Sequence, residues 1–520
     1  MAKNKVFKAA GIVMIVSLLS KIIGLLRDTM IGSHFGATYS TDAYTTSLMI
    51  PNILFGIFGF AITTTFIPIL TEIHSQKNKE EMFEFSNNVM NILIVVSVIF
   101  AAIGLLTAPQ IVKLVAPKFT GAKYELTVTL TRYSIVNILF LSLTSGYTAI
   151  LQTLDEFMAP ALVGIIMNLP IIVYLLMGNK YGIEGLTIAT IIGDAMQILI
   201  QIPWLLKNNY RYHFKIDLKD SRIKKMLALI APVIIGTCVN QINAVVQNNM
   251  ASGLPDGSIL ALDYANKLHG MVYFTFAAAI ITVVFPSLSR EGTSSDYTNF
   301  KSHITTAVNS INLILFPCVV GLIILRVPII SILFQHGQFD QRAVDMTSMA
   351  LFYLVFGMVF WGVRDVFNRA FYALQDTKTP MVNGILGIVV NIVLSVILVG
   401  KMGIGGLTLS TSIAALFCCI LLILKLRKKI GYINGVEMVI TALKVLGSSI
   451  IMGCITYLLF NTLSSVLIGK KGQIIILLIC TIIAIIVYSI ALYLLKVKEF
   501  TAILKELKRK FFSRRIFSEK

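Results

Sequence analysis

Charged side chains are scarce in this sequence. Asp, Glu, Lys and Arg make up only 13% of its 520 residues, whereas a soluble protein carries about 25%. Apolar stretches near the length of about 20 residues that a helix needs to cross a bilayer recur along the whole chain. No segment between them is long enough for a separate soluble domain. The sequence therefore predicts an all-α polytopic membrane protein.

Cysteine is also rare, and its six copies show no metal-binding pattern. All six lie inside apolar stretches, and none has CxxC or Cys/His spacing, so we expect small core or lipid-facing residues. No HExxH, GxSxG, Walker loop or paired-carboxylate pattern is present either. These absences argue against an enzyme, a metal site, a bound cofactor and a transporter that hydrolyses ATP itself.

Fourteen apolar segments are predicted to be transmembrane helices. The first follows a basic N-terminus, as the core of a signal peptide would, but it continues through charged residues without a cleavage motif. We therefore predict that it is the first span. The segments lie near residues 11–31, 43–70, 86–107, 128–152, 159–178, 184–206, 226–250, 262–285, 304–326, 344–372, 381–400, 404–425, 438–460 and 473–495.

Lys and Arg are distributed unevenly between the two sets of loops. An even number of spans places both termini on one side, and that side carries most of the basic residues, including seven from Lys207 to Lys225 and nine from Lys496 onward. Because basic loops stay in the cytoplasm, we predict that both termini are cytoplasmic. The basic tail, 496–520, is expected to rest on anionic membrane lipids rather than to bind nucleic acid.

The chain resembles itself at an offset of about 220 residues. The run GIEGLTIAT from Gly182 matches GIGGLTLST from Gly403, and Pro160 has its counterpart in Pro380. Each repeat would hold six helices, so the two lobes, 1–215 and 222–432, are predicted to have the same orientation in the membrane. Helices within 438–495 have no counterpart and form an appended hairpin. Two such lobes predict a central cavity that opens alternately to each side.

The first predicted helix has a polar stripe. Its members fall within about 120° of the helix circumference, and a lipid-facing helix would not place charges there, because unpaired charges in the bilayer are costly. We interpret the stripe as lining a wet cavity; the alternative is that Arg27 and Asp28 only hold helices together. The stripe consists of Ser17, Ser20, Lys21, Gly24, Arg27 and Asp28.

The predicted helix 262–285 also has a polar face, which consists of Asp263, Asn266, Lys267 and Gly270. Asp263 fits an external interface equally well, whereas Lys267 lies about one turn deeper and favours a cavity role. Asp42, at the start of the second span, fits either a helix N-cap or a surface charge.

Other charges within the predicted spans leave alternatives open. Arg364, Asp365 and Arg369 lie toward the cytoplasmic end of 344–372, where they fit snorkelling, a gate or substrate contact. Asp194 is the lone acid of 184–206, and it fits a proton or ion site as well as an internal pair.

Several short motifs together resemble the MurJ family of flippases, and the resemblance covers essentially all fourteen helices. The repeated-lobe plan alone would also fit multidrug exporters and O-antigen flippases of the same superfamily. The motifs are Ser20–Asp28, Thr41–Tyr44, Ile50–Asn52, Phe66–Leu70, Pro286–Leu288, Leu333–Phe339 and Gln375–Pro380.

The resemblance implies a flippase that carries lipid II, an undecaprenyl-diphosphate-linked peptidoglycan precursor, from the inner to the outer leaflet of the bacterial inner membrane. It also implies a groove for the lipid tail at the appended hairpin. Because a diphosphate needs cations in a low-dielectric cavity, the charges agree with this substrate. The implied substrate site comprises the family cations Arg27, Lys21 and Lys267, the acids Asp28 and Asp42, and the neighbouring Ser20, Asn266 and Arg364.

Coupling to an ion gradient or to the membrane potential is a further expectation. Asn391 and Thr411 match a sodium site found in some members, but Gln247 and Ser395 stand where acids are expected. Besides lipid II, cell-wall synthesis proteins are candidate partners. The alternative functions are export of another lipid-linked oligosaccharide or of drugs, and a non-transporting scaffold role in cell-wall synthesis.

Overall fold

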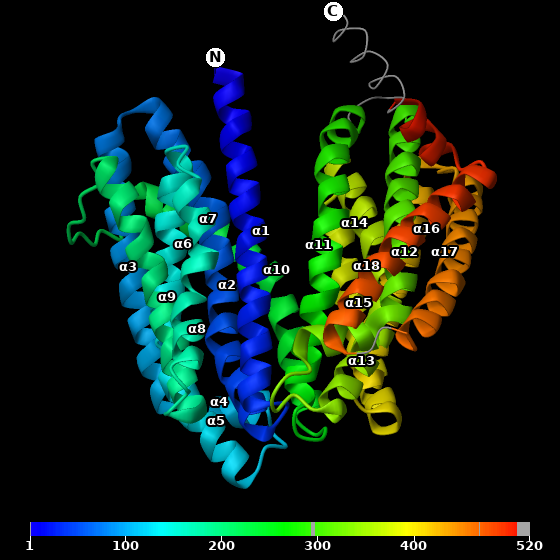
Figure 1. Ribbon diagram of the computed structural model, residues 1–520. Helices are drawn as coiled ribbons and strands as arrows, with labels where there is room; N and C mark the ends of the chain where they lie inside the picture. Colours follow the sequence, from blue (N-terminus) through cyan, green and yellow to red (C-terminus); the bar gives the residue numbers. More distant parts are fainter. Residues whose placement is uncertain (1, 293–296, 467–468, 507–520) are drawn as a thin grey trace, which may run out of the picture. The chain divides into compact units, whose positions relative to one another are not determined.

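The computed structural model describes residues 2–292, 297–466 and 469–506, and these residues form α-helices and their connections, without a β-strand (Figure 1). The first nine helices are α1 (Ala2–Phe35), α2 (Tyr39–Gln76), α3 (Lys79–Leu106), α4 (Ala108–Val115), α5 (Gly121–Ser134), α6 (Asn137–Thr153), α7 (Met158–Ile166), α8 (Leu169–Leu176) and α9 (Gly182–Lys207). They are followed by α10 (Ser221–Ala251), α11 (Ser258–Glu291), α12 (Thr298–Phe334), α13 (Gln341–Val355), α14 (Met358–Ala373), α15 (Lys378–Met402), α16 (Ile404–Ile430), α17 (Gly435–Ser464) and α18 (Lys470–Leu494). The predicted all-α membrane fold is thus confirmed.

Nine helical segments of the described chain are long and apolar enough to cross a membrane. The pair α13 and α14, which is bent by 41°, adds a tenth if it forms one span. Each of the fourteen predicted segments overlaps a helix or two successive helices. The count of fourteen spans itself stays a prediction.

Some predicted spans are interrupted. The segment 159–178 breaks between α7 and α8, where Pro170 stands in the first turn of the new helix. Proline lacks the amide hydrogen that would continue the preceding helix, and its ring collides with the carbonyl four residues back. The segments 128–152 and 344–372 break between α5 and α6 and between α13 and α14.

The chain forms two compact units. Unit 1 comprises Met1–Leu260 with Phe334–Ala343, and unit 2 comprises Ala261–Leu333 with Val344–Lys520. These bounds describe which segments pack together, whereas the predicted lobes 1–215 and 222–432 describe a correspondence in sequence. The lobe bounds, the appended segment 438–495 and the tail 496–520 therefore stay predictions.

Local geometry recurs in the two halves at the predicted offset. The backbone turns into the left-handed region at Asp155 (φ 58°) after α6 and at Gln375 (φ 57°) after α14. The next amide closes the turn in the same way: Glu156 donates to the Leu151 carbonyl and Asp376 to the Phe371 carbonyl, both at 2.9 Å. This is the hydrogen bond of a Schellman helix end.

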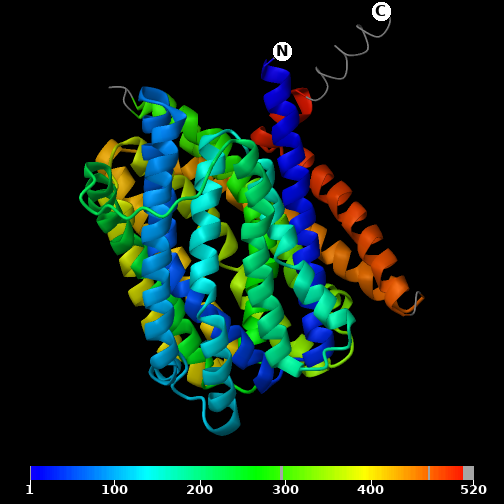
Figure 2. The same ribbon diagram turned by 90° about the vertical axis from the view of Figure 1, so that its left-hand side faces the viewer.

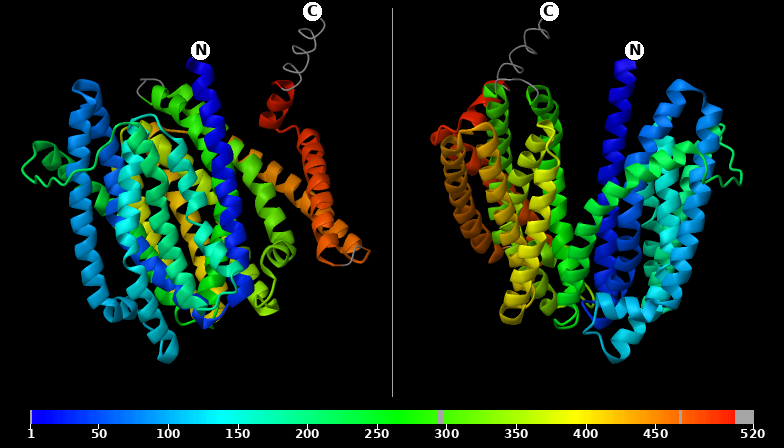
Figure 3. Two further views of the ribbon diagram at one scale, coloured as in Figure 1. Left: turned by 60° about the vertical axis from the view of Figure 1, so that its left-hand side comes forward. Right: turned by 180° about the vertical axis from the view of Figure 1, so that it is seen from behind.

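Within unit 1, α2 packs against α5, α6 and α10, and α6 lies between α3 and α9 (Figure 2). Fully buried side chains such as Phe66, Phe85 and Met90 belong to an apolar cluster of this unit. Within unit 2, α15 packs against α16, and α17 and α18 form a hairpin (Figure 3). Large apolar residues remain exposed along α17 and α18, as a lipid-facing hairpin requires.

Gly193 of α9 tests this packing. A methyl group at this position would collide with the carbonyl oxygen of Met167, a backbone atom at the break between α7 and α8. We expect Gly193→Ala to lower the free energy of unfolding by about 1–3 kcal/mol, as other overpacking substitutions do. Gly384→Ala in α15 is the matched control, because no atom lies within 4 Å of its added methyl group. Thermal unfolding in detergent compares them, and equal midpoints would contradict the packing of α9.

Candidate functional site

Arg27 and Asp28 of α1 form an ion pair. Nε and Nη2 of Arg27 donate to Oδ1 of Asp28 at 3.1 and 2.8 Å, and Asp28 is buried. Arg27 also lies near enough to Asp194 of α9 for the two charges to attract each other, while Gln197 donates to Asp194 at 2.6 Å. Asp194, the lone acid of the predicted span 184–206, therefore belongs to a cluster of charged residues from α1 and α9.

The rest of the α1 stripe has two environments. Ser20 packs against Gly164 of α7, and a methyl group added at Gly24 would lie 3.9 Å from the side-chain nitrogen of Asn168. These small residues let α1 approach α7 and α8 closely. Lys21 is exposed, so its ammonium group is accessible. The stripe thus combines helix packing with accessible charge.

Asp42 is 1% exposed, and its carboxylate is surrounded by donors. One oxygen pairs with Lys123 at 2.8 Å and accepts the Gly257 amide at 2.8 Å. The other accepts the amides of Ile259 and Leu260 at 3.0 and 3.1 Å. Neither predicted alternative describes this arrangement: the N-cap of α2 is Thr38, and Asp42 is a buried charge that satisfies the unpaired amides at the start of α11.

Lys123 and Asp256 complete this arrangement, and the sequence reasoning did not single them out. Lys123 of α5 pairs with both Asp42 and Asp256 at 2.8 Å. Its partners lie 81 and 133 residues away along the chain, so no local pattern could have connected them. Lys123 and Asp256 also line a polar pocket of about 510 Å³ in unit 1.

On α11, Lys267 pairs with Asp263 one turn earlier at 2.7 Å, and about a third of each side chain is exposed. The ammonium group also lies 5.4 Å from the ring centre of Tyr264, and Asn266 is exposed. The predicted polar face therefore exists in unit 2, with accessible charges. Because Arg27 and Lys267 belong to different units, their joint action on one substrate stays a prediction.

The charged residues of α14 lie beside aromatic residues of α11. Arg364 lies 3.4 Å from Asp365, and Tyr273 of α11 donates its hydroxyl to the other Asp365 oxygen at 2.6 Å. The Arg369 guanidinium stacks 5.1 Å from the Phe285 ring centre. These contacts join α11 to α14 within unit 2.

The candidate ion residues of unit 2 are neighbours. The hydroxyls of Thr411 and Ser395 each lie 3.5 Å from the side-chain oxygen of Asn391. These are neutral oxygen donors, and no group of three His, Cys, Asp or Glu side chains that could hold a metal occurs in the described parts of the chain. Ion binding by Asn391, Thr411 and Asp194 stays a prediction.

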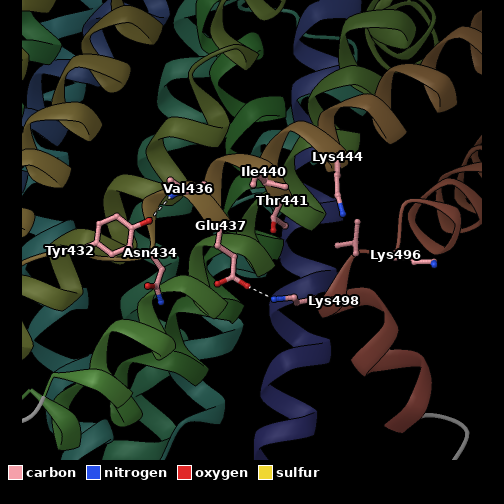
Figure 4. A pocket seen from close by; sticks show the side chains of 10 residues that line it. Tyr432, Asn434, Val436, Glu437, Ile440, Thr441, Lys444, Lys496 and Lys498 are labelled. Atoms are coloured by element: carbon pink, nitrogen blue, oxygen red, sulfur yellow. Dashed lines mark hydrogen bonds and ion pairs between the residues drawn. The ribbon is translucent and has the colours of Figure 1, made fainter.

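A basic pocket of about 410 Å³ lies where α17 begins and α18 ends (Figure 4). Lys498 donates to Glu437 at 2.7 Å, and this bond and the carboxylate charge raise the pKa of Lys498. Lys444 and Lys496 have no carboxylate partner among the described residues. Ammonium groups beside the Asn434 amide suit an anionic group. The pocket is lined by Tyr432, Asn434, Val436, Glu437, Ile440, Thr441, Lys444, Lys496, Val497 and Lys498.

Comparison with known proteins gives one consistent result. The model of a family described as lipid II flippase MurJ matches residues 31–470. A probable lipid II flippase MurJ of Buchnera aphidicola subsp. Schizaphis graminum is 32% identical over 81% of this chain and 83% of its own. The lipid II flippase MurJ of Burkholderia cenocepacia is 29% identical, with 81% and 84% covered.

Solved structures agree. One described as lipid II flippase MurJ in an inward closed conformation matches with a TM-score of 0.79 and 28% identity, covering 93% of this chain and 99% of that one. A multidrug transporter of the MATE family matches with a TM-score of 0.66 at 15% identity, which shows a shared fold alone.

Asp42 provides a test of the site geometry. Removal of one member of a buried ion pair costs about 3–5 kcal/mol, so Asp42→Ala should lower the free energy of unfolding by that order. Asp256→Ala is the control, because the Asp256 side chain is 54% exposed and exposed ion pairs contribute about 0–1 kcal/mol. Thermal unfolding in detergent measures both. If Asp42→Ala does not accumulate, Asp42→Asn keeps an acceptor oxygen and should show a smaller loss. Equal stability of the Asp42 variants and the control would refute the capping role.

Proposed function

The chain belongs to the lipid II flippase MurJ family, and we propose that it moves lipid II from the cytoplasmic to the outer leaflet of the inner membrane by alternating access. The observation that carries this proposal is the family match over residues 31–470, supported by relatives that align over most of both chains. Lipid II is the substrate, and the chain acts as a transporter rather than as an enzyme.

The charge on α1 supports an anionic substrate. Arg27 offers a planar fork of donors that fits phosphate oxygens in pairs, and 18% of its side chain is exposed. Without substrate, Asp28 neutralises this charge. A diphosphate presents more oxygens and more charge than one carboxylate, so it can replace Asp28 as the partner of Arg27. An exporter of cationic drugs would need the opposite charge at this position.

Lys21 and Lys267 add point charges, and in this proposal Lys267 engages the same diphosphate as Arg27. Ser20, Asn266, Arg364 and Asp42 complete the proposed substrate-binding set. No cofactor is required, and an ion gradient or the membrane potential drives transport. Both termini are cytoplasmic, and cell-wall synthesis proteins are proposed partners.

Two experiments separate this function from its rivals. Depletion of the protein in cells should cause lipid II to accumulate in the inner leaflet. Purified protein in vesicles should move lipid II between leaflets, which a scaffold without transport activity would not do. Absence of lipid II binding together with transport of a drug or another lipid-linked oligosaccharide would favour those exporters.

Substitutions of Arg27 and Lys267 test the cation hypothesis. Charge-assisted hydrogen bonds contribute about 1.5–3 kcal/mol, so Arg27→Ala should weaken lipid II binding about ten- to a hundredfold. Arg27→Lys keeps the charge but loses the donor fork, and it should lose more function than Lys267→Arg. Lipid II binding and complementation of a flippase-depleted strain measure the effects.

The control for these variants is Lys180→Ala, which removes an exposed charge between α8 and α9. It should bind lipid II and complement normally. Normal binding and full complementation by Arg27→Ala, in protein that is expressed and inserted normally, would reduce Arg27 to a helix-packing role.

The proposed orientation has its own test. Ser221, exposed at the start of α10, should lie in the cytoplasm. A cysteine at this position should therefore not react with an impermeant reagent in intact cells, whereas a cysteine at Lys180 should react readily. The background for both is Cys454→Ser, because Cys454 is exposed. Labelling of position 221 from outside would overturn the orientation.

A further inference from the structure

The connection between α9 and α10 exposes a row of large apolar side chains. Residues 210–217 have no helical structure, and every second residue from 212 onward is apolar. Isolated exposed apolar residues are common, but a contiguous row of them marks an interaction surface. The exposed fractions are 51% for Tyr212, 74% for Phe214, 42% for Ile216 and 62% for Leu218.

Three asparagines of α3 hold the backbone of this segment. Asn87, Asn88 and Asn91 are fully or almost fully buried, although α3 is otherwise apolar enough to span a membrane. Their side-chain amides bind the segment, and Asn88 also accepts the Asp217 amide at 2.8 Å. The amide bonds to backbone carbonyls of the segment are those from Asn87 to Arg211 at 3.0 Å, from Asn91 to His213 and Lys215 at 3.1 and 3.2 Å, and from Asn88 to Asp217 at 2.9 Å. The Asn87 amide also lies 2.9 Å from Nδ1 of His213.

These bonds show that the segment is extended along α3. The Tyr212 hydroxyl also donates to the Asn91 side-chain oxygen, so Phe214, Ile216 and Leu218 are the members of the row without a bond to α3. The bound carbonyls belong to residues 211, 213, 215 and 217, and alternate carbonyls face the same side only in an extended chain. Each buried amide left without a partner would cost about 1–3 kcal/mol, so the register of the segment is strongly specified. The hydrogen bonds to α3 therefore hold the segment in one conformation, in which the row is exposed.

Basic residues alternate with the apolar row. Lys215 lies 3.4 Å from Glu84 in a solvent-exposed pair, whereas Arg211 and Lys219 have no carboxylate partner within the described residues. Aromatic, aliphatic and basic side chains together are typical of segments that lie in the membrane interface. The segment also begins directly after α9, a candidate span, so it emerges at the membrane surface.

We propose that residues 210–219 form an interfacial anchor that binds the surface of an anionic membrane. Phe214, Ile216 and Leu218 enter the headgroup region, and Arg211 and Lys219 contact lipid phosphates. The charge complementarity favours lipid over a protein partner, because anionic headgroups attract basic segments of this kind at a membrane surface. This anchor is independent of lipid II transport.

A fluorescent amino acid that senses polarity tests the anchor. It replaces Phe214 in one protein and Gln76, exposed at the end of α2, in a control. Each full-length protein is reconstituted into vesicles of phosphatidylcholine with phosphatidylglycerol. The label at 214 should be quenched by lipids that carry a nitroxide near the headgroup, and the label at 76 by iodide in the water.

Charge variants test the anionic preference. Neither Arg211 nor Lys219 makes a side-chain hydrogen bond or ion pair within the described chain, so Arg211→Gln and Lys219→Gln should fold normally. A basic residue at the membrane surface contributes about 1 kcal/mol, so each change should lower the ratio of lipid-quenched to iodide-quenched label about fivefold.

Three results would overturn the proposal. The label at 214 is as accessible to iodide as the label at 76, which shows that the row faces water. The label is protected in native membranes but not in vesicles, which identifies a protein partner. Burial is equal in vesicles of phosphatidylcholine alone and insensitive to both charge variants, which removes the role of anionic lipid.

Discussion

A bilayer offers buried charges and amides no hydrogen-bond partner, so the protein must supply every one of them. The Asp42 carboxylate shows how far this constraint reaches. It binds a lysine of α5 and three amides around the start of α11, and it thereby joins segments more than 200 residues apart in sequence. The buried asparagines of α3 meet the same requirement by binding the backbone of a connection that has no helix of its own.

The same constraint shapes the proposed transport site. Arg27 is an expensive charge for a membrane helix, and Asp28 and Asp194 reduce its cost before any substrate arrives. If Arg27 binds the substrate as proposed, the substrate must displace an internal partner, which favours a strongly charged molecule. Lys267 is likewise paired with an acid, Asp263 of the same helix. Both side chains are more exposed than those of Arg27 and Asp28.

Hydropathy and periodicity predicted the helices well, because both depend on each segment alone. The breaks after α5, α7 and α13 were missed. No proline marks the first and the third, although Pro170 marks the second. The Arg27–Asp28 pair was only the alternative interpretation, because residues one apart on a helix diverge by about 100°. The flexible Arg27 side chain brings the two charges together. The partners of Asp42 lie far away in sequence, so tertiary structure alone could identify them. The binding role of three α3 residues was also missed. Asn87, Asn88 and Asn91 lie near the start of a predicted span, where polar residues are common and do not indicate a distant partner.

The left-handed turns after α6 and α14 have an evolutionary consequence. Neither position is glycine, and the two residues differ, Asp155 in one half and Gln375 in the other. The hydrogen bonds that close the turns involve only the main chain. After a duplication, the side chains at such a turn are free to diverge while the main-chain bonds keep the helix end in place. Two repeats can therefore keep the same backbone geometry after their side chains at that turn no longer match.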